Sequence, residues 1–259
     1  MANNSNLSRR AALRQQQELE ARRKRNARML GVGLGVLTLV VAVVITIVIA
    51  NAIGGRDFAT PPNATEGYGI AIKSKNIQPT GNVPNVVVYE DYQCPGCKQH
   101  ETHYSSAFQQ LIDEGKITLE IRTAYFLNDV NTTTNEKSSE RAALAAAAAD
   151  AVGKYREYHQ VVYENQPQEG VGYTDQQLRV DFADKAGITG DDLATFQNLY
   201  DTKAYAEFAK RSYRAMREAK IGSTPAYIVN GKEIDLKNLP SNDPQTVLTA
   251  IQSAASGSN

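Results

Sequence analysis

The feature that most constrains this chain is the segment Cys94-Pro95-Gly96-Cys97, which holds its only two cysteines. The segment directly follows the apolar run 86–89, Val-Val-Val-Tyr, and precedes a helix-compatible stretch from Lys98 to Ile112. A short apolar run of this kind is typical of a buried strand. The sequence therefore predicts a strand, a turn that carries both cysteines, and a helix that begins at the first of them. A disulfide within the chain can only join these two residues.

The position of Cys94 at the start of a helix indicates its chemistry. Unpaired N–H groups and the positive end of the helix dipole favour a thiolate there, so Cys94 is the candidate nucleophile. Cys97 lies one turn later on the same side and is the candidate resolving thiol, able to attack a mixed disulfide at Cys94. Pro95 suits the first helical turn, and Gly96 lets the backbone lie close to a partner chain. The pattern indicates dithiol–disulfide exchange.

Charge is sorted along the chain although its formal sum is zero. Residues 1–28 carry eight Arg and Lys against two Glu, or +6, which leaves −6 for the remainder. The acidic remainder has no basic patch with interleaved aromatic residues, so we expect no nucleic-acid binding. From Met29 to Gly55 no residue is charged. At about 1.5 Å per residue this stretch exceeds the roughly 30 Å core of a bilayer.

We therefore predict a basic cytoplasmic segment over 1–28, a transmembrane helix over 29–53 and a linker over 54–67. The positive-inside bias places the N-terminus in the cytoplasm and everything after Arg56 outside it, as in a single-pass protein of the cell membrane. A cleavable signal peptide is the alternative, because Ala50-Asn51-Ala52 resembles a cleavage site, although its apolar run is normally only about 7–15 residues. Either way the cysteines face an oxidising compartment.

Residues 68–256 are predicted to form one α/β domain. Besides the strand before Cys94, the pattern predicts a short edge strand near 69–73 and a second central strand over 117–126. A helical block follows from about 136 to 220, and Thr174 to Gln177 within it resembles a capping box. Strands over 226–229 and 232–234, joined by Asn230-Gly231, predict a hairpin, and 245–255 a final helix.

The order of these elements resembles the thioredoxin fold with a helical insertion, as in DsbA-like thiol-disulfide oxidoreductases. The most specific pieces are Asp91 to Cys97, Lys154 to His159 within the insertion, and Gly222 to Gly231. The resemblance implies that Pro225 follows a cis peptide bond and lies against the cysteines. It also implies that the backbone of Thr224 pairs with an extended substrate strand.

Two departures from this family matter. Many relatives carry, six positions before the first cysteine, a buried acidic residue that relays the proton of the resolving cysteine; here that position is Val88. Glu90, on the same strand face, is the candidate replacement, and the alternative is an ordinary polar residue at a strand end. Strong oxidases often have Pro-His between the cysteines, whereas Pro95-Gly96 offers the thiolate no side chain. The direction of the reaction therefore stays open.

The resemblance implies a membrane-anchored, extracytoplasmic enzyme that introduces disulfides into exported cysteine-containing client proteins and uses no cofactor of its own. It implies reoxidation by a quinone-linked membrane partner, of the DsbB or vitamin K epoxide reductase-like type. A thiol-disulfide reductase or an isomerase is the alternative in the same chemical class. A metal-binding or client-binding module without redox turnover is the alternative of another class.

The metal alternative depends on Cys94, Cys97, His100 and His103, which recur at three-residue steps. On one continuous helix they spread over about 13 Å of rise and cannot converge on one ion, so we expect no metal site. The histidines, His159 included, are expected to be surface or packing residues without a catalytic role. Four tyrosines of the insertion could line a client groove, but packing between helices is the favoured interpretation. They are Tyr155, Tyr158, Tyr163 and Tyr173.

Overall fold

A computed structural model describes residues 58–257, apart from 75–76, 78, 80–81, 131–134, 169 and 237–238. The basic segment predicted over 1–28 and the transmembrane helix predicted over 29–53 lie outside the described residues, as do the first four residues of the linker. Across the described part of the chain, no helix combines the length and apolar character needed to cross a bilayer.

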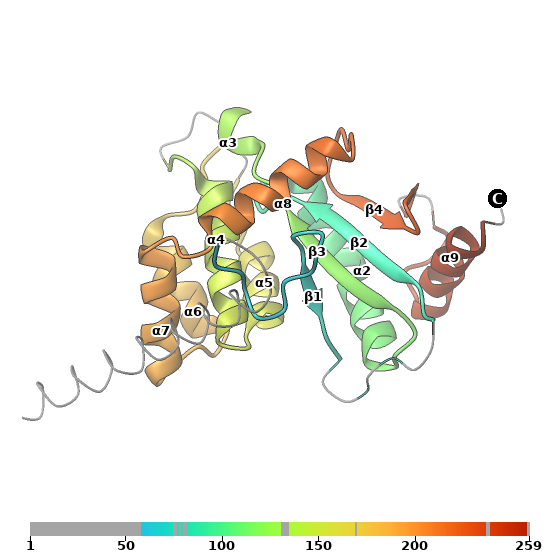
Figure 1. Cartoon of the computed structure of the whole chain (residues 1–259), viewed down its shortest axis with the longest axis horizontal. Helices are drawn as coiled ribbons and strands as arrows, with labels where there is room; N and C mark the ends of the chain where they lie inside the picture. Colours follow the sequence, from blue (N-terminus) through green and yellow to red (C-terminus); the bar gives the residue numbers. More distant parts are fainter. Residues whose placement is uncertain are drawn as a thin grey trace, which may run out of the picture. The chain divides into compact units, whose positions relative to one another are not determined.

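The strands form one sheet with the order β1-β3-β2-β4-β5 (Figure 1). Their bounds are β1 Ile70–Ile72, β2 Asn85–Glu90, β3 Thr118–Thr123, β4 Ala226–Val229 and β5 Lys232–Ile234. β2 and β3 run parallel, and the other neighbouring pairs run antiparallel. β2, the strand that leads to Cys94, is central because β3 and β4 pair with its two edges. The predicted edge strand, central strands and hairpin are thereby confirmed.

The helices cover both faces of this sheet. Their bounds are α2 Pro95–Asp113, α3 Leu127–Val130, α4 Ser138–Ala151, α5 Tyr155–Glu164, a π-helical turn Gln177–Asp181, α6 Phe182–Lys185, α7 Gly190–Asp201, α8 Ala206–Glu218 and α9 Pro244–Ser256. Alternate residues of β2 point to opposite faces. Val88 faces the side that α2 covers, whereas Val87 and Tyr89 face Met216 of α8. Figure 1 shows α8 crossing the sheet and α4 to α7 gathered beside it.

Helices α4 to α8 lie between β3 and β4 in the chain, where the helical insertion was predicted. The alanines of α4 before Ala151 are almost fully buried, as expected of a close-packed helix. The tyrosines 155, 158, 163 and 173 are at most 5% exposed, so the packing interpretation is confirmed and they line no client groove. Three of their hydroxyls donate hydrogen bonds to backbone carbonyls, at Leu178, Asp91 and Tyr92.

Local signals in the sequence correspond to specific backbone geometry. Asn230 (φ 50°) and Gly231 (φ 78°) both adopt the left-handed conformation that a two-residue hairpin of type I′ requires. Thr174 Oγ1 accepts a hydrogen bond from the Gln177 N–H, and the Gln177 side chain accepts one from the Thr174 N–H, which confirms the capping box. The second central strand is shorter than predicted, because the chain turns after Thr123 into the unpredicted helix α3.

Candidate active site

The first cysteine sits where β2 ends and α2 begins. Cys94 is the N-cap residue of α2, with an extended backbone (φ −73°, ψ 118°), and Pro95 occupies the first helical turn. The Cys97 thiol donates a hydrogen bond to the Cys94 sulfur, and the backbone N–H groups of Cys97 and Gly96 also donate to it. Together they outweigh burial and lower the pKa of Cys94 from its ordinary 9.0 to about 6. Cys94 is therefore a thiolate at neutral pH, as a nucleophile requires.

The loop before β4 closes over this thiol. The Thr224–Pro225 peptide bond is cis, as the family resemblance implied. In its thiol form, Cys94 Sγ donates a hydrogen bond to the Thr224 carbonyl oxygen at 3.4 Å. A Cβ at position 96 would lie 3.6 Å from both that oxygen and Pro225 Cδ, so Gly96 keeps this approach open. The structure thus brings Cys94, Gly96, Thr224 and Pro225 together, as predicted.

The second cysteine lies behind the first and is shielded from solvent. Cys97 is 3% exposed, against 9% for Cys94. Burial raises the pKa of Cys97 well above its ordinary value, and the neighbouring Cys94 sulfur and the Glu90 carboxylate raise it further. The two sulfur atoms are not joined, so the structure is that of the dithiol. One thiol is ready to attack, and the other stays protonated until a base takes its proton.

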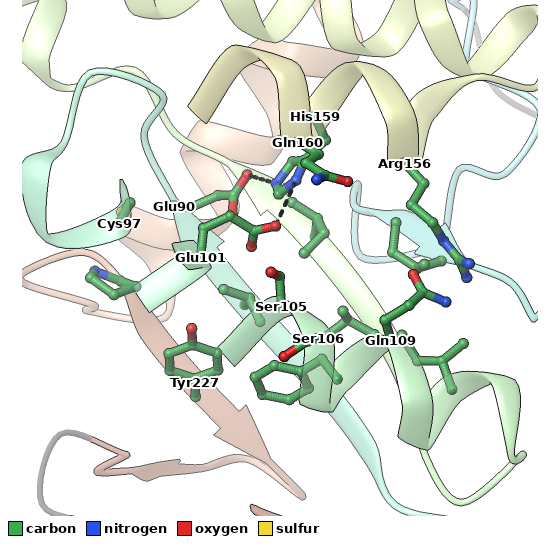
Figure 2. A pocket seen from close by; sticks show the side chains of 17 residues that line it. Glu90, Cys97, Glu101, Ser105, Ser106, Gln109, Arg156, His159, Gln160 and Tyr227 are labelled. Carbon is green, nitrogen blue, oxygen red and sulfur yellow. Dashed lines mark hydrogen bonds and ion pairs between the residues drawn. The ribbon is translucent and has the colours of Figure 1, made fainter. Parts of the chain in front are cut away.

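Glu90 lies on the Cys97 side of the turn. It is 4% exposed at the end of β2, and with Val88 and Cys97 it lines a pocket of about 310 Å³ between the sheet, α2 and α5 (Figure 2). The prediction that Glu90 shares a strand face with Val88 is therefore confirmed. Glu90 is more than a polar residue at a strand end, because its Oε1 lies 2.7 Å from Nε2 of the buried His159.

His159 and Glu101 are site residues that the sequence analysis missed. His159 is 6% exposed and packs against tyrosine rings, as one of the two expected placements had it, but it also forms an ion pair with Glu90 that was not expected. Its Nδ1 lies 3.7 Å from Glu101 Oε1. Burial alone would lower the pKa of His159, but Glu90 and Glu101 overcome this and raise it to about 9. One signal was available for Glu101: it follows Cys97 by four residues and so shares its helix face.

The other two histidines lie apart from this cluster. His103 is exposed, as expected, whereas His100 is half-buried because its ring stacks on Tyr227. Within the described residues, no group of three or more His, Cys, Asp and Glu side chains is arranged to hold a metal ion.

The helical insertion also holds the active-site turn in place, which the sequence analysis did not foresee. Gln166 Nε2 donates hydrogen bonds to the carbonyl oxygens of Tyr92 (2.7 Å) and Cys94 (3.1 Å). The buried Asp91 carboxyl accepts from the backbone N–H groups of Gln93 and Leu127 and from a serine hydroxyl of α4. Burial raises the pKa of Asp91 to about 6. These contacts fix the loop between β2 and Cys94.

Comparisons with known proteins agree with this geometry. Similar solved structures include MdbA, a thiol-disulfide oxidoreductase from Actinomyces oris (20% identity, TM-score 0.58, 77% of this chain and 92% of that one). Reduced DsbA from Mycobacterium tuberculosis shares 22% identity (TM-score 0.55, 74% and 100%), and oxidised BdbD from Bacillus subtilis 21% (TM-score 0.56, 78% and 100%). No curated protein sequence matches.

The fold is thus shared with DsbA, MdbA and BdbD, as the resemblance of the sequence implied. A family model described as thioredoxin matches residues 82–251, which include both cysteines, the cis-proline loop and the helical insertion. This chain belongs to the thioredoxin family.

Proposed function

We propose that this protein is a thiol-disulfide oxidoreductase that introduces disulfides into exported cysteine-containing proteins by exchange at Cys94 and Cys97. The observation that carries the proposal is the contrast between the two thiols in one helical turn. Cys94 has a pKa lowered to about 6 and lies at the cis-proline loop, whereas the pKa of the buried Cys97 is raised well above its ordinary value. An exchange enzyme needs one thiol that attacks or leaves as a thiolate and a resolving thiol that loses its proton only when it attacks.

In the oxidising direction, a client thiolate attacks Cys94 Sγ of the disulfide form. The bond between the two cysteines breaks, its electron pair leaves on Cys97 Sγ, and Cys97 takes up a proton because its pKa is high. A second client thiolate then attacks the client sulfur of the mixed disulfide, and Cys94 leaves as a thiolate. The client loses two electrons and the enzyme gains them. Thr224 and Pro225 would hold the client chain, and Glu90 would exchange the proton of Cys97.

Two arguments favour the oxidising direction. Lowering the pKa of Cys94 stabilises the dithiol relative to the disulfide at neutral pH, which makes the disulfide a stronger oxidant. The apolar stretch from Met29 to Gly55 supports an anchored protein whose catalytic domain faces an oxidising, extracytoplasmic compartment. A quinone-linked membrane partner of the DsbB or vitamin K epoxide reductase-like type would reoxidise the Cys94–Cys97 dithiol in that compartment.

A reductase is the second candidate, and the pKa of Cys94 supports it. The pKa of Cys94, at about 6, lies between the values near 3.5 of DsbA and near 7 of thioredoxin. A measurement of the reduction potential of the Cys94–Cys97 pair therefore decides between an oxidase and a reductase.

The test is to equilibrate the detergent-solubilised full chain in glutathione buffers and to read the redox state by alkylation of free thiols. A reduction potential of about −120 mV supports the oxidase, and a potential of about −270 mV supports the reductase. The chain has no tryptophan, so alkylation replaces a fluorescence readout. A Cys94–Cys97 pair that does not cycle between dithiol and disulfide would overturn the exchange function and favour a binding module.

A further inference from the structure

The first described segment of the chain, residues 58–65, is fastened to the helical insertion. The Asn63 backbone N–H and side-chain amide donate hydrogen bonds of 2.8 Å to the two carboxylate oxygens of Asp150, which is 3% exposed in α4. The Arg211 guanidinium of α8 lies over the Phe58 ring, 5.6 Å from its centroid. The described part of the predicted linker is therefore docked, and its first residue lies at α8.

Few residues separate this docked segment from the predicted transmembrane helix, which ends at residue 53. An extended chain spans at most about 3.6 Å per residue, so the steps from 53 to 58 cover at most about 18 Å. The apolar stretch that precedes them has no charged residue from Met29 to Gly55. An anchor there would keep the α8 side of the domain close to the bilayer that holds the chain.

The segment around α8 carries charge of the opposite sign to the rest of the domain. Residues 203–220 have six Lys and Arg against two Glu, or +4, whereas the rest of residues 58–259 has 13 against 23, or −10. A negatively charged membrane surface would attract this segment and repel the remainder. The charge distribution therefore favours one orientation of the domain at such a surface.

The basic side chains of α8 gather on the side that faces solvent. Lys210, Arg214 and Arg217 are exposed and recur at steps of four and three residues, which places them together on one face of the helix. We call these three residues the basic face. Arg211, which holds Phe58, is three residues from Arg214, so the docked segment lies at the edge of the basic face. The opposite side of α8 is buried against the domain through Phe208, Ser212 and Met216.

Most of the charge on this face is available to a ligand. Glu207 pairs with Arg211 at 2.7 Å and with Lys210 at 3.5 Å on the same helix. Arg214 and Arg217 form no ion pair with any residue that the structure describes. Two guanidinium groups one turn apart therefore point to solvent without a carboxylate of the domain to neutralise them.

The chemistry of the basic face fits phosphate groups of lipids better than a nucleic acid. Single-stranded nucleic acids are bound with exposed aromatic rings on which the bases stack. Here Tyr205 and Phe208 are buried, and the Tyr213 ring packs 4.7 Å from that of Tyr125. Guanidinium groups bind phosphate oxygens in a bidentate way without any aromatic ring. A phospholipid headgroup supplies such oxygens at the surface to which the short tether leads.

We infer that the basic face of α8 docks on anionic phospholipids of the membrane that anchors the chain. This inference rests on the proposed function, in which the protein is anchored and works outside the cytoplasm. α8 ends at Glu218, and the chain reaches Thr224 of the cis-proline loop six residues later. Docking would keep this loop within about 22 Å of the membrane-bound end of the helix. A redox partner in the same membrane could then reach the active site.

The competing explanation is that these charges only keep α8 hydrated. The anchor alone would then set the distance between α8 and lipid, and this distance would not depend on the charge of the lipid. If the basic face docks, α8 contacts lipid when anionic headgroups are present and loses the contact in high salt, which screens the attraction. Contact between α8 and anionic lipid therefore distinguishes the two explanations.

The experiment uses the full chain in vesicles and a single fluorescent reporter, since the chain has no tryptophan of its own. Ala206→Trp puts the reporter at an exposed position of α8. Gln252→Trp puts it at an exposed position of α9, which packs against α2. Vesicles of brominated phosphatidylcholine quench a tryptophan that contacts the bilayer, and they are compared with and without added phosphatidylglycerol.

Two charge variants are made in each reporter chain. The test variant replaces all three residues of the basic face with glutamine. The matched control removes three exposed charges elsewhere, as Lys116→Gln, Lys137→Gln and Lys232→Gln. Both variants lower the net charge by the same amount, so a difference between them reports where the charge lies.

We expect phosphatidylglycerol to increase quenching of the α8 reporter, high salt to reverse this, and the α9 reporter to stay unquenched. Each basic residue at an anionic surface favours docking by roughly fivefold, so the test variant should shift the balance between docked and undocked domains by roughly 100-fold. It should thereby lose the response to phosphatidylglycerol, and the matched control should keep it. Quenching of the α8 reporter that ignores phosphatidylglycerol, or that survives in the test variant, would overturn the inference.

Failure of the anchor or of the exchange function looks different. A chain that does not float with phosphatidylcholine vesicles in high salt has no anchor, and the inference falls with it. A Cys94–Cys97 pair that does not cycle would leave the quenching unchanged, because neither reporter depends on the thiols. Loss of docking would in turn leave the exchange of this pair with glutathione unchanged.

Discussion

The two cysteines of the active-site turn are surrounded by different groups, although they are only three residues apart in the sequence. On the Cys94 side, the Cys97 thiol lowers the pKa most, and the Thr224 side chain and the backbone N–H groups at the start of α2 lower it further. On the Cys97 side, the polar groups are side chains of Glu90, His159 and Glu101 around a pocket. One side stabilises a thiolate, and the other keeps a thiol protonated and in reach of groups that can exchange its proton.

This difference separates two demands on an exchange enzyme. The nucleophile must be ionised whenever it is not part of a disulfide, and the dipole at a helix start favours this without a titratable neighbour. The resolving thiol must change its protonation state within each turnover, and backbone dipoles cannot do this. Titratable side chains can, and the fold brings them from β2, α2 and the insertion to one place.

The largest expected effect comes from removing each sulfur in turn. Cys94→Ser should abolish oxidation of a reduced client, because no sulfur remains where the client attacks. Cys97→Ser should abolish multiple turnover too, but its Cys94 thiolate should attack the disulfide of an oxidised client, release one client thiolate, and accumulate as a mixed disulfide that resists release. Mass spectrometry of the trapped adduct checks the distinction. An adduct formed equally by Cys94→Ser and Cys97→Ser would contradict the assignment of nucleophile and resolving thiol.

The next effect concerns the free energy of unfolding. His159→Leu leaves the buried Glu90 carboxylate without its partner and should cost about 3–5 kcal/mol. The double variant Glu90→Leu/His159→Leu should cost clearly less than the sum of the two single variants, since no buried charge is left alone. Urea unfolding followed by circular dichroism measures all three. Asp201→Asn, which breaks the exposed pair with Arg179, should cost only about 0.2–1 kcal/mol as a control.

The two sides should also give stability opposite dependences on pH. The pKa of His159 is raised from 6.5 to about 9, so its contribution is full below pH 6.5 and is lost as the pH rises through 9. The pKa of Cys94 is lowered from 9.0 to about 6, so its contribution is present above 9 and is lost as the pH falls through 6. The oxidised chain, which lacks the free thiol, should therefore lose stability from pH 6.5 to 9.

The reduced chain should lose less over the same range, because the Cys94 contribution grows as that of His159 fades. Unfolding free energies of both redox forms at several pH values check this. In the oxidised form, His159→Gln should flatten the dependence. Equal slopes for the reduced and oxidised chains would contradict the lowered pKa of Cys94.

The same contrast explains what the sequence could predict. The Cys94 side follows from a local pattern, strand, C-x-x-C and helix, and its cis-proline loop from family resemblance, so Thr224 and Pro225 were placed correctly. Glu90 was found because it lies two residues after Val88, the position of the family's acidic residue, on the same strand face. His159 was missed because it is 69 residues from Glu90 in the chain. No periodicity or spacing reports how an inserted helix docks against the sheet.

The same limit applies to Gln166 of the insertion, whose amide binds the backbone of the active-site turn from 72 residues away. A glutamine near the end of a helix has no pattern that distinguishes it from a solvated one. The elements themselves were predicted to within a few residues, with α3 and the early end of β3 as exceptions. Those depend on how the chain turns after Thr123, where Ala124 N–H donates to the Glu90 carbonyl.

The smallest expected effect tests how much the Thr224 side chain contributes to the ionisation of Cys94. The Thr224 hydroxyl also helps to lower the pKa of Cys94, after the Cys97 thiol. Thr224→Val keeps the shape and the carbonyl but removes this donor. We expect the pKa of Cys94, read from the ultraviolet absorbance of the thiolate, to rise by less than about one unit, which corresponds to less than about 1.4 kcal/mol. A rise of several units would mean that the Thr224 hydroxyl, and not the Cys97 thiol with the helix start, governs the ionisation of Cys94.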